Sequence, residues 1–556
     1  MERKKSTVWF LIPAREGSKT IPKKNIRELA GKPLVKHVVD TIGQIANNEQ
    51  IIVSTDDENV KEIVKQIATI HDRSKNNADD FSTLDDVALE VANYLKNEHG
   101  ASEEDVLITC QTTSPFIRKE TLEKAVSIHQ NEDINSVITV KDDRHLRWTI
   151  NEGRAMPLYE KRVNRQQMDP VFGETGGVIS STIGHVLKNK TRIGNNISII
   201  EVDEKEGLDI DTYADWALAE YWANKLKICI RVDGAKDLGF GHLYRSLAIA
   251  QNIHAHEVCF ITQNANGYEL GLNFLKGHHY PIIEIESNED FLHRLGEIKP
   301  DILINDILDT EEEYMEVLKD YGCFVVNFED LGKGNRLADI VVNDLYPDIY
   351  PQKNHWYGVE HAILNPSFEM VDTRKEPEEE VSHILIAYGG TDPANLTEKA
   401  ILALQQIGYE QKVTIILGPG HSHYESVKER SGKLKADVTL LQNVSNMAAL
   451  MKEADLALTS AGRTVTELMT VGVPTITMCQ NNREMRHNHA SSTYGIVNLG
   501  LGSSISSEVL AEHIKMFVED VSLRRDMYAR MKSAVKNRSN AAIVSKILDT
   551  YKNHKN

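Results

Sequence analysis

The chain has 556 residues, several times the length of a typical domain of roughly 100–200 residues, so we expect two or three separate cores. Its 82 acidic residues outnumber 63 Lys and Arg residues and give a net charge of −19, which argues against a nucleic-acid-binding protein. Hydrophobic residues make up 41% of the chain, as in soluble globular domains and unlike disordered or fibrous chains. An anionic substrate would therefore need local clusters of basic residues.

The sequence predicts a cytoplasmic protein without a membrane span. The N-terminus passes from a short charged stretch into about six apolar residues, which is too short for a secretory signal, and no apolar run approaches the roughly 18 residues of a span. The cysteines are odd in number and scattered, with no CxxC pair, so we expect buried thiols rather than disulfides or a zinc site. They are Cys110, Cys229, Cys259, Cys323 and Cys479.

Repeated βα units organise the first part of the chain. β-branched runs begin at Val8, Ile51, Val106 and Val137, and each is followed by a polar turn and a stretch at helical spacing. This pattern is typical of an α/β domain with a mostly parallel sheet. Ligands bind such sheets at the carboxyl ends of the strands, so polar motifs at those places are candidate sites.

Two later series of βα units predict further domains. One begins with a strand over residues 227–232 and a helix over 243–253, and the other begins at 384–387, after the charged segment 372–380. Polar segments of this kind join domains. We therefore expect three domains, which span 1–225, 226–376 and 377–556.

A basic loop follows the first strand. Residues 11–25 read LIPAREGSKTIPKKN, with Arg15, Lys19 and Lys24 placed around Gly17 and Ser18. The cations can neutralise a polyphosphate while the backbone N–H groups of the small residues approach it. From the residues alone, a solvated basic surface loop remains the alternative.

Two carboxylates alternate in the sequence LDIDT at 208–212. On a strand, residues two apart point to the same face, so Asp209 and Asp211 can contact one divalent cation that also bridges nucleotide phosphates. The pattern predicts a Mg²⁺ site. The alternative is an edge strand that exposes two acids to water.

These motifs resemble the CMP-sialic acid synthetases, the cytidylyltransferases that activate nonulosonic acids. The resemblance extends over about residues 7–222 and includes STDD at 54–57 and QTTSP at 111–115. It implies a Rossmann-like, GT-A-like nucleotidyltransferase fold, CTP and a nine-carbon α-keto acid sugar as substrates, Mg²⁺ as cofactor, and release of pyrophosphate. A homo-oligomer formed through the N-terminal domain is a separate hypothesis, because the sequence does not give the oligomeric state.

The resemblance also implies roles for individual residues. Arg15 and Lys24 would act on the reacting phosphates, and this chain has ETGG at 174–177 where the family usually has an Asn-Gly pair, which leaves the identity of the sugar open. The remaining expected roles are Ser18, Lys19 and Asn25 for CTP, Arg73 and Gln111 for nucleotide and sugar, Lys141 and Arg165 for the sugar carboxylate, and Asp209 and Asp211 for the metal.

In the second half of the chain, the sequence GFGH at 239–242 places His242 between a strand and a helix. An accessible imidazole at this place can act as a general base. A histidine at the start of a helix that bonds only to backbone groups is the alternative.

Three further glycine-containing turns follow predicted strands in this half, at 388–393, 417–420 and 460–467. Each can offer N–H groups to an anion, and Glu467 can accept hydrogen bonds from ribose hydroxyls. The candidate ligand-binding residues are Gly390, Ser460, Gly462, Thr464 and Glu467.

This half resembles the UDP-sugar hydrolases of pseudaminic acid biosynthesis and the related spore-coat polysaccharide proteins. The resemblance implies a GT-B-like pair of Rossmann-like domains, a UDP-linked diacetamido-trideoxyhexose between them, and His242 as the catalytic residue. The chain departs from the family at Arg463, where a second glycine is usual, at Asn365, where Arg is common, and in residues 480–483.

The two resemblances together predict a bifunctional enzyme of nonulosonic acid biosynthesis. A condensation separates hydrolysis from CTP activation in such pathways, so a hydrolase would not pass its product directly to the first site. Two alternatives therefore stay open. The second half is a glycosyltransferase that uses the activated sugar, or it is a non-catalytic binding module.

Overall fold

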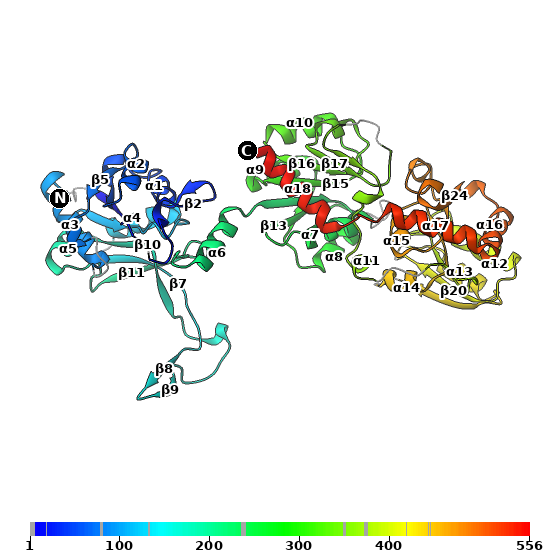
Figure 1. Cartoon of the computed structure of the whole chain (residues 1–556), viewed down its shortest axis with the longest axis horizontal. Helices are drawn as coiled ribbons and strands as arrows, with labels where there is room; N and C mark the ends of the chain where they lie inside the picture. The colour runs from blue at the N-terminus through cyan, green and yellow to red at the C-terminus, as the bar shows by residue number, and fades with distance from the viewer. Residues whose placement is uncertain are drawn as a thin grey trace. The chain divides into compact units, whose positions relative to one another are not determined.

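The computed structural model divides the chain into two compact units, Met1–Lys225 and Leu226–Asn556 (Figure 1). The residues that it describes are 6–17, 19–77, 82–131, 134–234, 241–347, 352–371, 376–418, 420–442, 444 and 446–555.

The first unit is built on one seven-stranded sheet with the order β11-β7-β10-β6-β1-β4-β5. At its centre, Phe10 of β1 pairs in parallel with Ile51 of β4 and Ile108 of β6, while β10 runs antiparallel to β6 and β7. The strands of this unit's sheets, apart from one hairpin, are β1 (Val8–Pro13), β2 (Glu28–Leu29), β3 (Lys32–Pro33), β4 (Ile51–Thr55), β5 (Thr69–Asp72), β6 (Val106–Thr109), β7 (Ser136–Asp142), β10 (Phe172–Thr182) and β11 (Ile197–Glu201).

Helices of the first unit bury their apolar residues against this sheet. In the first of them, Val35, Val38, Val39 and Ile42 share one face, which lies in the core with Phe10. The helices are α1 (Leu34–Ile42), α2 (Glu58–Val64), α3 (Leu84–Glu98), α4 (Lys119–Asn131), α5 (Ile183–Asn189) and α6 (Tyr213–Ala223).

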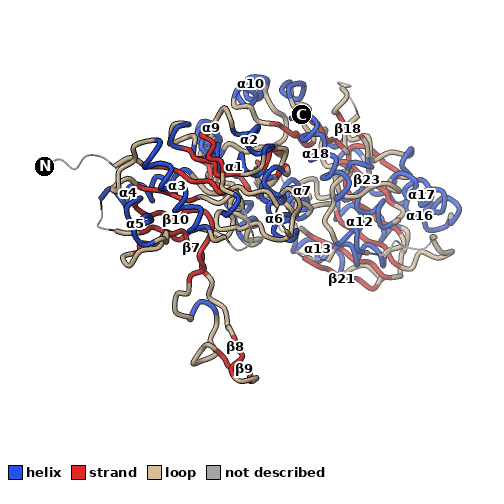
Figure 2. The backbone as a smooth tube through the Cα atoms, turned by 60° about the vertical axis from the view of Figure 1, so that its left-hand side comes forward, coloured by secondary structure: helices blue, strands red, loops and turns tan. Residues whose placement is uncertain are grey.

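A hairpin arm extends from this unit between β7 and β10. Its strands β8 (Trp148–Asn151) and β9 (Arg154–Pro157) are antiparallel, and all eight of their residues are exposed. Figure 2 shows the arm projecting away from the sheet that carries it. The turn residues Glu152 and Gly153 both have positive φ, at 48° and 78°, as a tight two-residue hairpin turn requires.

The second unit contains two fully parallel sheets. The first has the order β14-β13-β12-β15-β16-β17-β18, and the second has the order β21-β20-β19-β22-β23-β24. The strands are β12 (Lys227–Val232), β13 (Glu257–Gln263), β14 (Ile282–Ile285), β15 (Ile302–Asp306), β16 (Phe324–Phe328), β17 (Ile340–Asn343), β18 (His355–Tyr357), β19 (His383–Ala387), β20 (Lys412–Leu417), β21 (Asp437–Gln442), β22 (Leu456–Ser460), β23 (Thr475–Cys479) and β24 (Ile496–Leu501).

Helices alternate with these strands, as parallel connections require. They are α7 (Gly241–Gln251), α8 (Glu269–Lys276), α9 (Asn288–Ile298), α10 (Glu312–Asp320), α11 (Ser367–Met370), α12 (Leu396–Gln406), α13 (Tyr424–Ser431), α14 (Met447–Glu453), α15 (Thr464–Val471), α16 (Ser507–Glu519), α17 (Val521–Ala534) and α18 (Asn540–Lys555).

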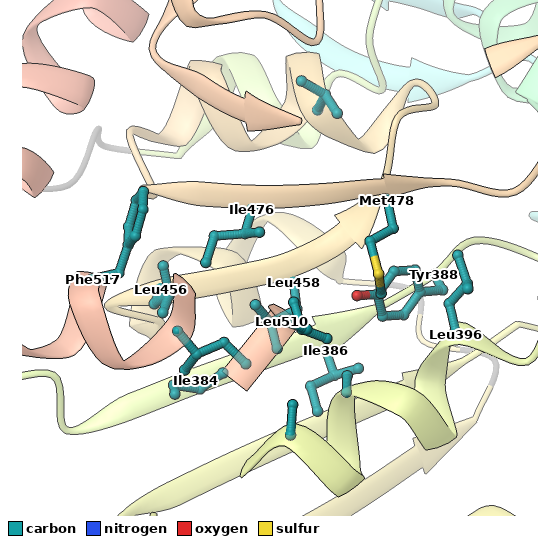
Figure 3. Packing of buried hydrophobic residues seen from close by; sticks show 14 of the residues in the cluster. Ile384, Ile386, Tyr388, Leu396, Leu456, Leu458, Ile476, Met478, Leu510 and Phe517 are labelled. Atoms are coloured by element: carbon teal, nitrogen blue, oxygen red, sulfur yellow. The ribbon is translucent and has the colours of Figure 1, made fainter. Parts of the chain in front are cut away.

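Each sheet of the second unit has its own core. In the second one, Ile384 and Ile386 of β19 lie beside Leu456 and Leu458 of β22, and Phe517 of α16 packs against them (Figure 3). The last helix, α18, belongs to the other core, where Ile543, Ile547 and Tyr551 pack with strands of the first sheet. The chain thus crosses between the two sheets twice.

The structure confirms the predicted α/β fold, with a nucleotidyltransferase-like first unit and two Rossmann-like halves in the second. Strands begin at Val8, Ile51 and Val106 as predicted, and Lys227–Val232 forms β12. All five cysteines are free thiols, and four of them are buried. Within the described residues, no helix has the length and apolar character needed to cross a bilayer. The division of the second unit at residue 376 stays a prediction.

The segment 208–211 does not form the predicted strand. Its backbone makes one bond to the sheet region, from Ile210 N to Thr113 O at 2.9 Å, and then enters the N-cap of α6 at Thr212. Leu208 and Ile210 are nevertheless buried, while Asp211 is exposed. Apolar and acidic residues alternate at 208–211 because one side of this extended segment is buried. The segment is not a strand of the sheet.

Candidate functional site

In the first unit, the basic loop is tied to the loop that follows β6. Asn25 Nδ2 donates to Arg15 O at 2.9 Å, and Thr112 Oγ1 donates to Asn25 Oδ1 at 2.6 Å. Asn25 therefore fixes the loop backbone at the carboxyl ends of β1 and β6. Arg15 is half-buried and Lys19 is exposed, whereas Ser18 lies outside the described residues.

Lys24 links this loop to the two acids. Its Nζ donates to Ile210 O at 2.8 Å and lies 3.2 Å from Asp211 Oδ1. The structure thus brings the basic loop and the LDID segment together, although 186 positions separate Lys24 from Ile210 in the sequence.

Asp209 has the character of a metal ligand. Burial raises the pKa of its carboxyl above the ordinary value, and its Oδ1 is buried with no hydrogen-bond partner among the described residues. A hard cation would satisfy this oxygen, so Asp209 and the nearby Asp211 fit Mg²⁺. In the described part of the chain, no group of three or more His, Cys, Asp or Glu side chains is placed to hold a metal, so further ligands would come from the substrate and water.

Gln111 lies against the ETGG segment of β10. Its backbone N donates to Gly176 O at 3.0 Å, and a Cβ on Gly176 would lie 2.8 Å from Gln111 Nε2 and 2.9 Å from Ser114 Oγ. A side chain at position 176 would therefore displace the side chains of Gln111 and Ser114. Arg73, at the end of β5, is buried, and its Nε donates to Asn77 O at 2.6 Å.

The two residues expected at the sugar carboxylate lie near one end of β7. Lys141 belongs to that strand and is half-buried, whereas Arg165 is exposed, with its Nη2 3.7 Å from Asp142 Oδ2. Hydrogen bonds from Arg144 already lower the pKa of Asp142 below its usual range. Arg165 is therefore only weakly held by Asp142 and can turn to another anion.

In the second unit, His242 forms a dyad with Asp306 at the end of β15. His242 Nδ1 lies 2.5 Å from Asp306 Oδ1, and Asp306 Oδ2 accepts from Arg245 Nε at 2.8 Å and from Ser246 Oγ at 3.0 Å. Burial alone would raise the pKa of Asp306, but the charges of Arg245 and His242 hold it below its ordinary value. The short contact with a carboxylate favours the proton on Nδ1, with Nε2 as the basic nitrogen, and Arg245 Nη2 also lies 3.0 Å from Nδ1.

Two more carboxylates surround Arg245, which is fully buried. Its Nη1 contacts Glu329, and Asp344 Oδ1 lies 4.0 Å away. From the other half of the unit, Arg463 Nη2 donates to Glu329 Oε1 at 2.5 Å and lies 3.8 Å from Asp344 Oδ1. Burial raises the pKa of Glu329 to about 8, and its φ of 52° is left-handed, so Glu329 occupies a strained position.

The turn Ser460–Thr464 joins β22 to α15. Two neutral histidines fix its carbonyl groups, since His487 Nδ1 lies 2.7 Å from Ala461 O and His489 Nε2 lies 3.0 Å from Gly462 O. Burial lowers the pKa of both imidazoles to about 4, so each is an uncharged N–H donor at neutral pH. Ser460 is buried, whereas Gly462 and Thr464 are half-buried.

Two carboxylates adjoin this turn. Glu484 is held by hydrogen bonds from the Ser460 side chain and the Ala461 backbone, although burial raises the pKa of its carboxyl. Glu467 lies in the first turn of α15 and is half-buried, and burial raises its pKa to about 7. Gly390 is exposed, and its carbonyl oxygen accepts a hydrogen bond from Gly420 N at 3.0 Å. This bond connects the turn at 388–393 to the turn at 417–420.

The sequence reasoning missed three carboxylates, Asp306, Glu329 and Asp344. Each lies at or just beyond the carboxyl end of a buried strand, in the sequences ILIND, FVVNFE and IVVND. Acidic residues that end an apolar strand in a parallel sheet are the signal that would have identified them.

Two family models match the chain. The model "Cytidylyltransferase" matches residues 9–154, and the model "Glycosyltransferase family 28 C-terminal domain" matches residues 384–547. The second match supports a glycosyltransferase-like fold and favours the transferase alternative over the hydrolase, for which none of these matches gives support.

Curated relatives match each unit. The CMP-N,N'-diacetyllegionaminic acid synthase of Legionella pneumophila is 30% identical over 219 residues, which is 38% of this chain and 93% of that protein. The spore coat polysaccharide biosynthesis protein SpsG of Bacillus subtilis is 26% identical over 340 residues, 59% of this chain and 99% of that protein. The uncharacterized protein MJ1062 of Methanocaldococcus jannaschii is 30% identical over 46% of this chain, and the match spans only 56% of that relative.

Proposed function

The chain belongs, through its first unit, to the cytidylyltransferase family, and from that premise we propose that this unit transfers CMP from CTP to a nonulosonic acid. The observation that carries the proposal is the meeting of Lys24 from the basic loop with Asp211 and the neighbouring Asp209, whose buried Oδ1 has no hydrogen-bond partner among the described residues. Cations and acids gathered at the carboxyl ends of parallel strands suit a metal-bound triphosphate.

In this reaction the anomeric hydroxyl of the acid attacks the α-phosphorus of CTP, the bond to the β-phosphate breaks, and pyrophosphate leaves. Lys24 and Arg15 would offset the charge that develops on the phosphate oxygens, and Lys141 and Arg165 would hold the sugar carboxylate. Asp209 and Asp211 would hold Mg²⁺, which supplies further charge neutralisation when it is bound. The protein otherwise contributes positioning.

The test is pyrophosphate release from CTP with a panel of nonulosonic acids, which includes N-acetylneuraminic, N,N'-diacetyllegionaminic and pseudaminic acids. We expect release with at least one nine-carbon acid and none without an acid. No release with any of them, in a protein that binds CTP, would contradict the proposed substrate class.

For the second unit, we propose transfer of a glycosyl group from a nucleotide-sugar, with His242 as the base. Nε2 of an imidazole held by a carboxylate can take the proton of an acceptor hydroxyl while the nucleoside diphosphate leaves. Water as the acceptor would make the same site a hydrolase. The decisive assay is UDP release from a UDP-linked diacetamido sugar, since a hydrolase releases UDP with water alone and a transferase needs the acceptor.

Glu467 predicts a pH dependence of nucleoside binding. Its pKa of about 7 lies above the ordinary value because the carboxyl is buried, so the proton is lost only as the pH rises through neutrality. Ribose hydroxyls donate best to the ionised form, so we expect uridine affinity to rise between about pH 6 and about pH 8. Uridine is the probe because it has no phosphate to titrate. In Glu467→Gln the pH dependence should disappear, and its persistence would exclude Glu467 as the ribose acceptor.

The hairpin arm is the surface that we propose for an oligomer of the first unit. Trp148 and Ile150 are 56% and 77% exposed, and an uncovered two-stranded hairpin is marginally stable in water, so a second copy of the chain would stabilise it. We expect Trp148→Ser with Ile150→Ser to lower the sedimentation coefficient to that of a monomer. An unchanged coefficient, or a monomeric parent, would contradict this role.

A further inference from the structure

Arg463 combines two positions that matter for an anionic ligand. Its backbone lies in the Ser460–Thr464 turn, immediately before α15, while its side chain reaches the other half of the second unit and contacts Glu329. The side chain is 18% exposed, so the guanidinium is held and still accessible. Arg463 thus links the Ser460–Thr464 turn to Glu329 and Asp344, the two carboxylates beside Arg245.

Only part of the guanidinium is used by the protein. Nη2 donates to Glu329 and lies near Asp344, whereas Nε and Nη1 have no hydrogen-bond partner within the described ranges. Each of these two nitrogens carries N–H hydrogens that can be donated to an oxygen of an anionic ligand, although they point to different sides of the guanidinium. The contact of Nη2 with Glu329 leaves the N–H groups of Nε and Nη1 unused within the described residues.

The start of α7 makes room for this side chain. A Cβ on Gly241 would lie 3.0 Å from Arg463 Cδ and 3.6 Å from Arg463 Nε. Arg463 therefore lies directly beside the backbone that presents His242. An anion bound to this guanidinium would therefore lie near the start of α7, the helix that carries His242.

The charges near the turn explain why a cation is needed there. Glu484 already accepts hydrogen bonds from Ser460 and Ala461, and its Oε1 would lie 3.5 Å from a Cβ on Gly462. The turn thus binds a carboxylate, and a phosphate placed beside Glu484 would meet a like charge. A guanidinium in the same turn offsets that repulsion.

We propose that Arg463 binds the diphosphate of the nucleotide-sugar in the second unit through the guanidinium N–H groups that the described residues leave unused, while Glu329 anchors its Nη2 from the opposite half. The inference rests on the proposed nucleotide-sugar site and adds a diphosphate-binding residue to it. Glu329 is a positioning residue, since it acts on the ligand through Arg463. Binding of the diphosphate and docking of the two halves are thereby coupled.

Calorimetric titration of the full chain with UDP, UMP and uridine tests the proposal. Loss of charge-assisted hydrogen bonds weakens binding by roughly 10- to 100-fold, so we expect Arg463→Met to lose that much affinity for UDP and little or none for uridine. Arg463→Lys should fall between, because Lys keeps the charge and has fewer N–H donors than the guanidinium. Glu329→Gln should also lower the ratio of UDP to uridine affinity.

Arg483→Met is the matched control. Arg483 also joins the two halves, with its Nη2 3.2 Å from Asp309 Oδ1 and its Nε 2.7 Å from Tyr346 Oη, but it lies outside the turn. If docking of the halves alone governs affinity, both Met variants will lose UDP and uridine binding equally, and that result overturns the proposal. Equal UDP binding by parent and Arg463→Met overturns it as well.

A failure of the proposed function gives a different result. If the parent binds UDP no better than uridine, the second unit has no diphosphate site, and the site and the role of Arg463 fall together. If CMP binds in an Arg463-dependent manner and UDP does not, the ligand is a nucleoside monophosphate and the diphosphate proposal fails while the site stands.

Discussion

Replacement of His242 by Asn is expected to lower turnover at the second site by roughly 10²–10⁴-fold, the usual contribution of a general base, and to leave UDP binding intact. Asn can keep a hydrogen bond to Asp306, but it cannot take a proton from an acceptor near neutral pH. The measurement is UDP release from a UDP-linked diacetamido sugar, with and without candidate acceptors, beside calorimetric UDP binding.

The controls separate a catalytic role from damage to the fold. Pyrophosphate release from CTP should be unchanged in His242→Asn, because the two units are separate compact bodies. Asp306→Asn should also reduce turnover, because an amide no longer selects the tautomer with the proton on Nδ1. Full turnover by the His242→Asn variant would show that the histidine only begins a helix.

The positions of the strands could be predicted from the sequence because each strand is a local run of β-branched residues. The run at 227–232 became β12 without change, and the strands at Val8, Ile51 and Val106 begin where their apolar runs begin. These patterns depend on neighbouring residues alone. The order of the strands depends on distant pairings, and no periodicity in the sequence reveals it.

The site could be predicted only in part. The motif around His242 was visible, but the partner that fixes its tautomer, Asp306, is 64 residues away and is brought to it by the parallel pairing of β12 with β15. The sequence identified Asp209 and Asp211 as candidate metal ligands but placed them on a strand. An extended segment outside the sheet shows the same alternation of apolar and polar residues as a strand, so the two could not be distinguished.

The role of Arg463 also could not be predicted from the sequence. In the sequence it is only a departure from an expected glycine, which counts against a phosphate-binding turn. In the structure its Nη2 donates a hydrogen bond to Glu329, which lies 134 residues away in the sequence. A residue that weakens a motif can therefore add a ligand-binding group when the fold gives it a partner.

The second large effect is expected at the metal-binding acids of the first unit. Asp209→Asn and Asp211→Asn should each lower CTP-dependent pyrophosphate release by about 100-fold or more, because a neutral amide is a weaker ligand for a hard cation, and loss of even an indirect contact to a metal costs 10- to 100-fold. Assays across a range of Mg²⁺ concentrations would measure this. Near-normal rates in both variants would exclude the assignment.

Stability gives an independent test of Asp209. Its pKa is raised by burial, so ionisation of the carboxyl disfavours the folded state, and this cost grows as the pH rises above the ordinary pKa of an aspartate. Asn carries no charge, so Asp209→Asn should unfold at the same temperature as the parent or slightly higher at neutral pH. Mg²⁺ with CTP should raise the melting temperature of the parent more than that of the variant, since bound metal offsets the buried charge only in the parent. An equal rise in both proteins would mean that the metal binds elsewhere.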